Sequence, residues 1–239
     1  MRKLYRGIWA DKLELGQELP IGGSIFGDEL TIKLILDFDS FNGQLENYHS
    51  PDKLSKAYEQ NKESVESWLT QNGSKADPYL FFVANSVQRK VQMLMQVNPH
   101  RLVDSFERFN RFKKDRARLT DLRGLALCAE QSAFGQYLLQ NVLEKGYSSS
   151  YMGGVVSQDQ DLKNDDHSFI VVKNSTPKTL IFDIARPHSK NNFPRILETD
   201  VPFSYELFDG KQDFTIGATE VLEGGRERFG VGHSWLEHR

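Results

Sequence analysis

The spacing of the apolar residues changes at Gly146 in this chain of 239 residues. Between residues 50 and 145 the apolar residues recur every three or four positions, which is typical of amphipathic helices. After Gly146 they form short runs rich in β-branched and aromatic residues, separated by Gly, Asn, Asp or Pro, which predicts strands. Helices followed by antiparallel strands are typical of the α+β class. We therefore predict an α+β fold.

The helical part divides at turn-forming residues. Ser50 is a suitable N-cap, Pro51 suits the first helical position, and Asn72-Gly73 predicts the end of that helix. The predicted helices are 51–72, about 82–96, a third that starts at Pro99 and carries Leu102, Phe106, Phe109 and Phe112, and 128–145. These segments give the N-terminal region a mostly helical character.

Short strand-like runs lie on both sides of the helices. The predicted strands are Ile21–Phe26, Leu30–Phe38, Tyr151–Val156, His167–Lys173, Thr179–Asp183, Phe203–Phe208, Phe214–Leu222 and Arg228–Val231. The chain length suits one domain, and 38% apolar residues supply its core. We predict a single domain over 1–239, with a mostly helical N-terminal region at 1–120 and a core with C-terminal strands at 121–239.

The composition limits the classes of partner. There are 30 basic and 33 acidic residues, so the formal charge of −3 gives no overall attraction to nucleic acid or to anionic membranes. No apolar stretch approaches the roughly 20 residues that a membrane-spanning helix needs, and no apolar signal-peptide core follows the N-terminus. We expect no membrane partner and no nucleic-acid partner, and a protein that is cytoplasmic or secreted without a cleavable N-terminal signal.

Cys128 is the only cysteine, which excludes an internal disulfide and a zinc site built on cysteines. A thiol is a good nucleophile at neutral pH only when its thiolate is stabilised, commonly by a helix N-terminus and a neighbouring imidazolium. Cys128 begins the helix predicted at 128–145, so backbone N–H groups would lie near its sulfur and near an oxyanion formed in acyl transfer. Cys128 is therefore the predicted nucleophile.

His167 and Asp183 are the predicted partners of this thiol. His167 opens the strand His167–Lys173, and Asp183 ends the strand Thr179–Asp183. The turn-forming residues between them predict a hairpin that brings Asp183 alongside His167. A carboxylate there would accept the imidazole N–H and fix its tautomer, as the third member of a triad does.

Other residues compete for these roles. His188, in a polar loop, and His233, near the C-terminus, are alternatives for the base. Asp165 and Asp166 compete with Asp183, although acids adjacent to His167 in sequence reach its far ring nitrogen poorly. Cys128 itself could be a small buried apolar residue, because isolated cysteines are commonly so.

Four short motifs surround the candidate residues: Leu-Cys128-Ala-Glu-Gln-Ser-Ala, Tyr-Met-Gly-Gly-Val-Val, His167 at a strand start, and Ile-Phe-Asp183-Ile-Ala-Arg-Pro187. Their order and spacing over residues 124–187 resemble the papain/transglutaminase-like superfamily of cysteine hydrolases. The compact spacing is similar to that of bacterial toxin and effector members, which deamidate or cleave proteins of a host cell. The family often has Gly or Trp beside the cysteine, where this chain has Leu127 and Ala129.

The resemblance implies a papain/transglutaminase-like core, in which a catalytic cysteine at a helix N-terminus packs on an antiparallel sheet. It also implies a Cys-His-Asp triad acting on a protein substrate, with glutamine deamidation as the first expectation and cysteine protease activity as the second. An amine in place of water would make the reaction a transglutamination. No metal or organic cofactor is implied. The oxyanion would be held by the N–H of Cys128 and an upstream side chain, with Gln96, Asn98 and Asn85 as candidates.

Two functions of other classes are kept as alternatives. One is a non-catalytic protein-binding module on the same scaffold. The other is an ADP-ribosyltransferase, because Leu-Tyr-Arg-Gly-Ile near the N-terminus resembles the arginine-bearing first strand of those enzymes. The basic residues of 108–123 are interpreted as the solvated face of the Phe-bearing helix, or as a docking face for an acidic partner.

Overall fold

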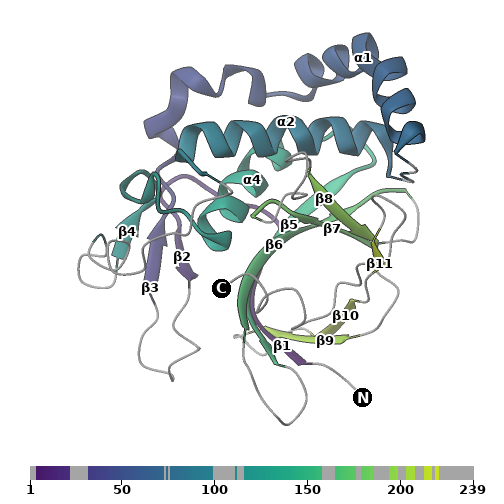
Figure 1. Cartoon of the computed structure of the whole chain (residues 1–239). Coiled ribbons are helices and arrows are strands. Elements are labelled where there is room, and N and C mark those ends of the chain that lie inside the picture. Colours follow the sequence, from purple (N-terminus) through teal and green to yellow (C-terminus); the bar gives the residue numbers. More distant parts are fainter. Residues whose placement is uncertain are drawn as a thin grey trace.

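The computed structural model describes residues 4–21, 32–72, 74, 76–98, 111, 116–157, 165–175, 179–185, 194–198, 203–207, 213–216 and 219–220 (Figure 1). The described residues form a mixed α+β fold. Figure 1 shows a strongly curved sheet with α1, α2 and α4 on one side of it. The predicted fold class is confirmed at this level.

The described strands form two sheets. The large sheet has the order β10-β9-β1-β5-β6-β7-β8-β11, and the small sheet has the order β2-β3-β4. Within the large sheet β1 and β9 pair in parallel and the other neighbours pair antiparallel. The strands are β1 Leu4–Ala10, β2 Glu18–Ile21, β3 Ile32–Ile35, β4 Arg116–Arg118, β5 Ser148–Ser157, β6 Asp165–Lys173, β7 Thr179–Asp183, β8 Arg195–Glu198, β9 Phe203–Leu207, β10 Asp213–Ile216 and β11 Thr219–Glu220.

The helix α1 (Pro51–Gln71) has the predicted bounds within one residue. Ser50 precedes it in an extended conformation, and Asn72 is its C-cap. Its buried residues, Leu54, Tyr58 and Leu69, repeat at helical spacing. Because α1 buries only one side, most of its surface is exposed and polar. Three short 3-10 helices, η2 Phe38–Gln44, η3 Glu46–Tyr48 and η4 Leu119–Leu122, complete this part of the fold.

The helix α2 (Pro78–Met95) starts four residues earlier than predicted. Asp77 causes the early start, because its carboxylate accepts a hydrogen bond from the Leu80 N–H at 2.9 Å and Pro78 takes the first helical position. The Asp77 carboxylate also accepts a hydrogen bond from the Tyr147 hydroxyl at 2.7 Å. Burial, with Asp77 beside the hydroxyl, raises the pKa of Tyr147.

The helix α4 (Cys128–Val142) lies between α2 and the large sheet and is buried over most of its surface. Gly135 shows how closely these layers approach. A Cβ at that position would stand 2.7 Å from Ile184 Cδ1, 3.0 Å from Ile170 Cδ1 and 3.8 Å from Val87 Cγ1. The absence of a side chain at Gly135 therefore lets helix and sheet meet at this point.

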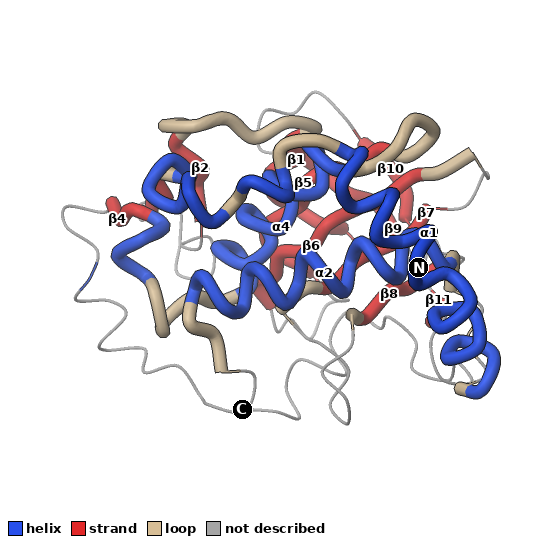
Figure 2. Tube along the Cα trace, turned by 90° about the horizontal axis from the view of Figure 1, so that it is seen from above, coloured by secondary structure: helices blue, strands red, loops and turns tan. Residues whose placement is uncertain are grey.

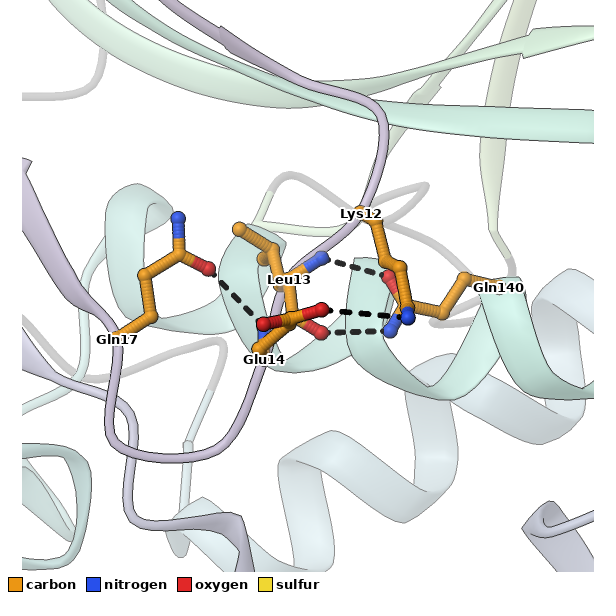
Figure 3. A network of polar contacts seen from close by, with 5 residues as sticks. All are labelled: Lys12, Leu13, Glu14, Gln17 and Gln140. Atoms are coloured by element: carbon orange, nitrogen blue, oxygen red, sulfur yellow. Dashed lines mark hydrogen bonds and ion pairs between the residues drawn. The ribbon is translucent and has the colours of Figure 1, made fainter.

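Glutamine side chains of α4 bind the chain that follows β1. The Gln140 carboxamide accepts from the Leu13 N–H at 2.9 Å and donates to the Leu13 carbonyl at 2.7 Å (Figure 3). One turn earlier, Gln136 Nε2 donates to the carbonyls of Asp11 and Ser149 at 3.1 and 2.9 Å. These contacts satisfy backbone groups at the ends of β1 and β5. The view in Figure 2 shows α4 running beneath α2 alongside these strands.

The first strand corrects the predicted division of the chain. β1 lies in the middle of the large sheet, between β5 and β9, so residues 4–10 belong to the sheet of the predicted core rather than to a separate helical N-terminal region. Sequence analysis did not predict β8 either. The third predicted helix, apart from Arg111, and the predicted strand Arg228–Val231 lie outside the described residues. Within the described residues no helix is long and apolar enough to cross a membrane.

Candidate active site

Cys128 is the first residue of α4, as predicted. Its side chain is partly buried and forms no disulfide. The preceding residue, Leu127, is the N-cap and contributes no side-chain cap hydrogen bond. A leucine side chain cannot accept a hydrogen bond, so the N-cap side chain binds no N–H group of the first turn. The positive end of the helix dipole at this terminus favours an anionic sulfur or an oxyanion.

His167 is the third residue of β6, two positions after the start of the strand. It pairs with Gly154 in the uninterrupted antiparallel ladder between β5 and β6. This strand begins at Asp165, so Asp165 and Asp166 belong to β6 and precede the histidine within the strand. His188 and His233 lie outside the described residues.

β6 and β7 form the predicted hairpin, and β7 has the predicted bounds Thr179–Asp183. The ladder between these strands starts at the pair Ile170–Phe182, so its register continues to Phe169 opposite Asp183. Residues two apart in a strand share a face. His167 and Asp183 therefore occupy the same face of the sheet on a diagonal, where Cα atoms are about 7–8 Å apart.

Asp183 is buried, with 1% of its surface exposed. Arg195 of β8 lies directly opposite it in the β7–β8 ladder. Sequence analysis missed this neighbour because β8 contains only two apolar residues, Ile196 and Leu197, which do not alternate.

The start of α4 lies beside the beginning of β6. The Ser132 hydroxyl donates a hydrogen bond to the Ser168 carbonyl at 2.9 Å, and Ser168 follows His167. This carbonyl lies beyond the last β6–β7 pair, where β7 no longer accompanies β6. Cys128 precedes Ser132 by four residues, which is about 6 Å along the same helix face. Gly135 lies by Ile170 and Ser132 by Ser168, so the helix runs toward the beginning of β6 in the direction of Cys128.

The strand register sets the direction from which Cys128 can approach. Ile170 and Ile184, which contact α4 around Gly135, belong to one face of the sheet. The strand register assigns His167 and Asp183 to the other face of the sheet, together with Phe169 and Ile181. A contact between Cys128 and His167 therefore has to run around the open edge of β6, beyond the end of β7, and not through the sheet.

The three oxyanion candidates lie at different distances from this helix start. α2 runs antiparallel to α4, because the Tyr79 hydroxyl at the start of α2 binds the carbonyl of Val142, the last residue of α4, and the N–H of Glu144 just after it. The C-terminal end of α2 therefore lies near Cys128, and the Gly124 N–H donates to the Met95 carbonyl there at 2.7 Å.

Gln96, the C-cap of α2, and Asn98 are exposed and follow this end of the helix. Asn85 lies ten residues before Met95, which is about 15 Å along the helix. The antiparallel packing thus favours Gln96 and Asn98 and makes Asn85 a poor candidate.

A buried polar cluster that sequence analysis missed lies next to the candidate residues. The hydroxyls of Tyr151 and Ser168 are 3.0 Å apart, and both residues are nearly fully buried. Gly153 pairs with Ser168 across the ladder, and a Cβ on it would overlap the Tyr151 hydroxyl. The Gly-Gly pair of the strand motif is the one signal in the sequence that pointed to a close approach here.

Among the described residues no group of three or more His, Cys, Asp or Glu side chains is placed to hold a metal ion. Comparison of the chain with protein-family models, with curated proteins and with solved structures gives no match.

Proposed function

We propose that this protein is a thiol-dependent amide hydrolase or acyl transferase that acts on a protein substrate. Cys128 is the nucleophile, His167 is the base and acid, and Asp183 orients the imidazole. Deamidation of a glutamine side chain is the first candidate reaction, and hydrolysis of a peptide bond is the second. The observation that supports the proposal most directly is the start of α4 at Cys128 beside the open edge of β6.

The chemistry follows from the roles of the three residues. The Cys128 thiolate attacks the amide carbonyl carbon, and His167 protonates the nitrogen that leaves as ammonia or as an amine. The tetrahedral oxyanion is stabilised by the backbone N–H of Cys128 and by a donor near the end of α2, for which Gln96 and Asn98 are suited. Water, deprotonated by His167, then hydrolyses the thioester and releases the carboxylate product.

The reactivity of the thiol tests the proposal before any substrate is known. At pH 6.5 an ordinary thiol of pKa about 8.5 is about 1% ionised, whereas a thiol of pKa about 6.5 is half ionised. The lower pKa also reduces the nucleophilicity of the thiolate, so about 50-fold more thiolate gives a rate about 5- to 10-fold higher. We expect Cys128 to react with iodoacetamide at pH 6.5 faster than a cysteine peptide by this factor.

Variants connect this reactivity with the proposed partners. His167→Ala and Asp183→Asn are expected to slow alkylation toward the rate of the peptide, whereas His49→Ala, at an exposed position before α1, leaves it unchanged. Near-ultraviolet circular dichroism checks that each variant is folded. A wild-type rate no higher than that of the peptide, or a His167→Ala variant that reacts like the wild type, refutes the triad.

The mass of candidate substrates distinguishes the two reactions. Deamidation of a glutamine side chain adds about one dalton to an intact protein, because NH₂ is replaced by OH, whereas proteolysis produces fragments whose masses sum to that of the substrate plus water. Cys128→Ala is the matched control, since it removes the nucleophile and leaves the sheet unchanged. A mass change that persists in this variant contradicts the assignment of Cys128.

A further inference from the structure

Two side chains of α4 hold the peptide group that joins Ala126 to Leu127. Glu130 Oε2 accepts a hydrogen bond from the Leu127 N–H at 2.7 Å, and Gln131 Nε2 donates a hydrogen bond to the Ala126 carbonyl at 3.0 Å. Both side chains are buried, with exposed fractions of 0% and 5%. We call these two hydrogen bonds the peptide clamp.

The clamp replaces an ordinary helix cap. An N-cap side chain normally accepts a hydrogen bond from an N–H of the first turn and so covers the helix terminus. Leu127 provides no such hydrogen bond. The entering chain is held instead by side chains that reach back from the first turn, as the glutamate of a capping box does. This fixes the helix start while no N-cap side chain covers the terminus where Cys128 lies.

The geometry of a peptide group makes the clamp restrictive. The C=O and N–H of a trans peptide lie in one plane and point in opposite directions. When both groups are hydrogen-bonded, the peptide plane cannot turn by rotation about the Cα–C bond of Ala126 or the N–Cα bond of Leu127. Cys128 follows directly, so its Cα and Cβ have a defined position relative to α4. A buried carboxylate is costly unless it is hydrogen-bonded, which favours a specific role for Glu130.

We infer that Glu130 and Gln131 are positioning residues that fix the backbone of the nucleophile Cys128, an inference that rests on the proposed function. Neither residue is assigned contact with the substrate. Glu130 acts as a hydrogen-bond acceptor, so a glutamine carbonyl at the same place is sufficient. Gln131 acts as a hydrogen-bond donor, so a side chain of similar length that lacks a donor cannot replace it.

Four variants test this inference through the rate of alkylation of Cys128 at pH 6.5. Glu130→Ala and Gln131→Met are expected to lower the rate about 5- to 10-fold, to that of an ordinary thiol. Glu130→Gln, which keeps an acceptor, is expected to stay within about twofold of the wild type. Gln140→Ala is the matched control, because it removes two backbone hydrogen bonds from the same helix, three turns from Cys128.

Hydrogen exchange of the Leu127 amide, followed by NMR, reports the clamp independently of reactivity. The amide is expected to be protected in the wild type and in Glu130→Gln, and to exchange faster in Glu130→Ala. The inference is overturned if alkylation keeps the wild-type rate while the amide becomes unprotected. It is also overturned if Glu130→Gln reacts as slowly as Glu130→Ala, since the charge would then be required.

The outcomes separate this inference from the proposed function. If the wild-type thiol reacts no faster than a cysteine peptide, the proposed function fails whatever the amide shows. If the wild type is fast and His167→Ala is slow, while both clamp variants remain fast, only the positioning role fails. Should Glu130→Ala not fold, Gln131→Met and Glu130→Gln decide the question by themselves.

Discussion

Replacing Gly153 by alanine tests the packing between β5 and the polar cluster beneath α4. A Cβ at this position would overlap the Tyr151 hydroxyl and stand 2.7 Å from Ser168 Oγ and 2.8 Å from Tyr151 Cζ. Tyr151 is 1% exposed and Ser168 is 2% exposed, so neither can move into solvent without disturbing the core. The new methyl group therefore has to displace a buried tyrosine or shift the strand.

The magnitude follows from three contributions. Overpacking of a well-packed core costs about 1–3 kcal/mol. Separating the Tyr151 and Ser168 hydroxyls costs about 1 kcal/mol for the hydrogen bond, and more if either is left unsatisfied. The lower conformational entropy of alanine in the unfolded chain returns about 0.5–1 kcal/mol. The free energy of unfolding is therefore expected to fall by about 1–3 kcal/mol.

Urea denaturation measures this loss, with Gly43→Ala as the matched control. A Cβ on Gly43, which lies in η2, would meet no atom within 4 Å, so this substitution should change stability by no more than about 0.5 kcal/mol. Tyr151→Phe removes the overlapping hydroxyl and should lower the cost of Gly153→Ala by about 1 kcal/mol or more. The reasoning is refuted if the Tyr151 and Gly153 substitutions are additive within about 0.5 kcal/mol, or if Gly153→Ala costs no more than Gly43→Ala.

Three further predictions concern the ties between helices and sheet. Asp77→Ala removes the N-cap of α2 and the hydrogen-bond partner of Tyr147, and should lower the free energy of unfolding in urea by about 2–3 kcal/mol. Tyr147→Phe removes only the second of these contacts and should lower it by about 1 kcal/mol. Equal losses in the two variants would contradict a separate contribution of the cap. Gln136→Met leaves the carbonyls of Asp11 and Ser149 without this donor and should cost about 2–4 kcal/mol; a change below about 1 kcal/mol would refute the contact. Burial raises the pKa of Tyr48 to about 12, whereas an unfolded tyrosine titrates near 10. The free energy of unfolding should therefore fall as the pH rises from about 10 through 12, and absorbance at about 295 nm should show Tyr48 ionising late. A Tyr48→Phe variant with the same alkaline loss of stability would refute this contribution.

The sequence predicts the elements whose signals are local. α1 begins after Ser50 and ends before Asn72, and α4 begins at Cys128, because caps, proline and helical spacing are properties of neighbouring residues. β7 has its predicted bounds for the same reason, since turn-forming residues and Asp183 delimit a short β-branched run.

The elements that sequence analysis missed depend on distant parts of the chain. β1 is a central strand because it pairs with β5 on one side and with β9 on the other, and the sequence of residues 4–10 does not indicate either partner. Likewise, the position of Arg195 opposite Asp183 is a property of the register between β7 and β8. Pairing and register are set by tertiary packing, and a shift of one residue would exchange the two faces of a strand.

The same dependence decides how the candidate residues relate to one another. The order Cys128, His167, Asp183 and the hairpin can be read from the sequence, but the face on which each residue lies cannot. The strand register assigns His167 and Asp183 to one face of the sheet and leaves the other face to α4. Ser132 of α4 binds the Ser168 carbonyl beyond the last β6–β7 pair, beside the edge between these faces. In the proposed function, a nucleophile at the first residue of α4 would approach the histidine around that edge, whereas a cysteine at the place of Gly135, about two turns later, would lie over Ile170 and be separated from the histidine by the sheet. The proposed function thus requires Cys128 at the helix start for two reasons: for an approach to His167 around the edge of β6, and for the ionisation of the thiol.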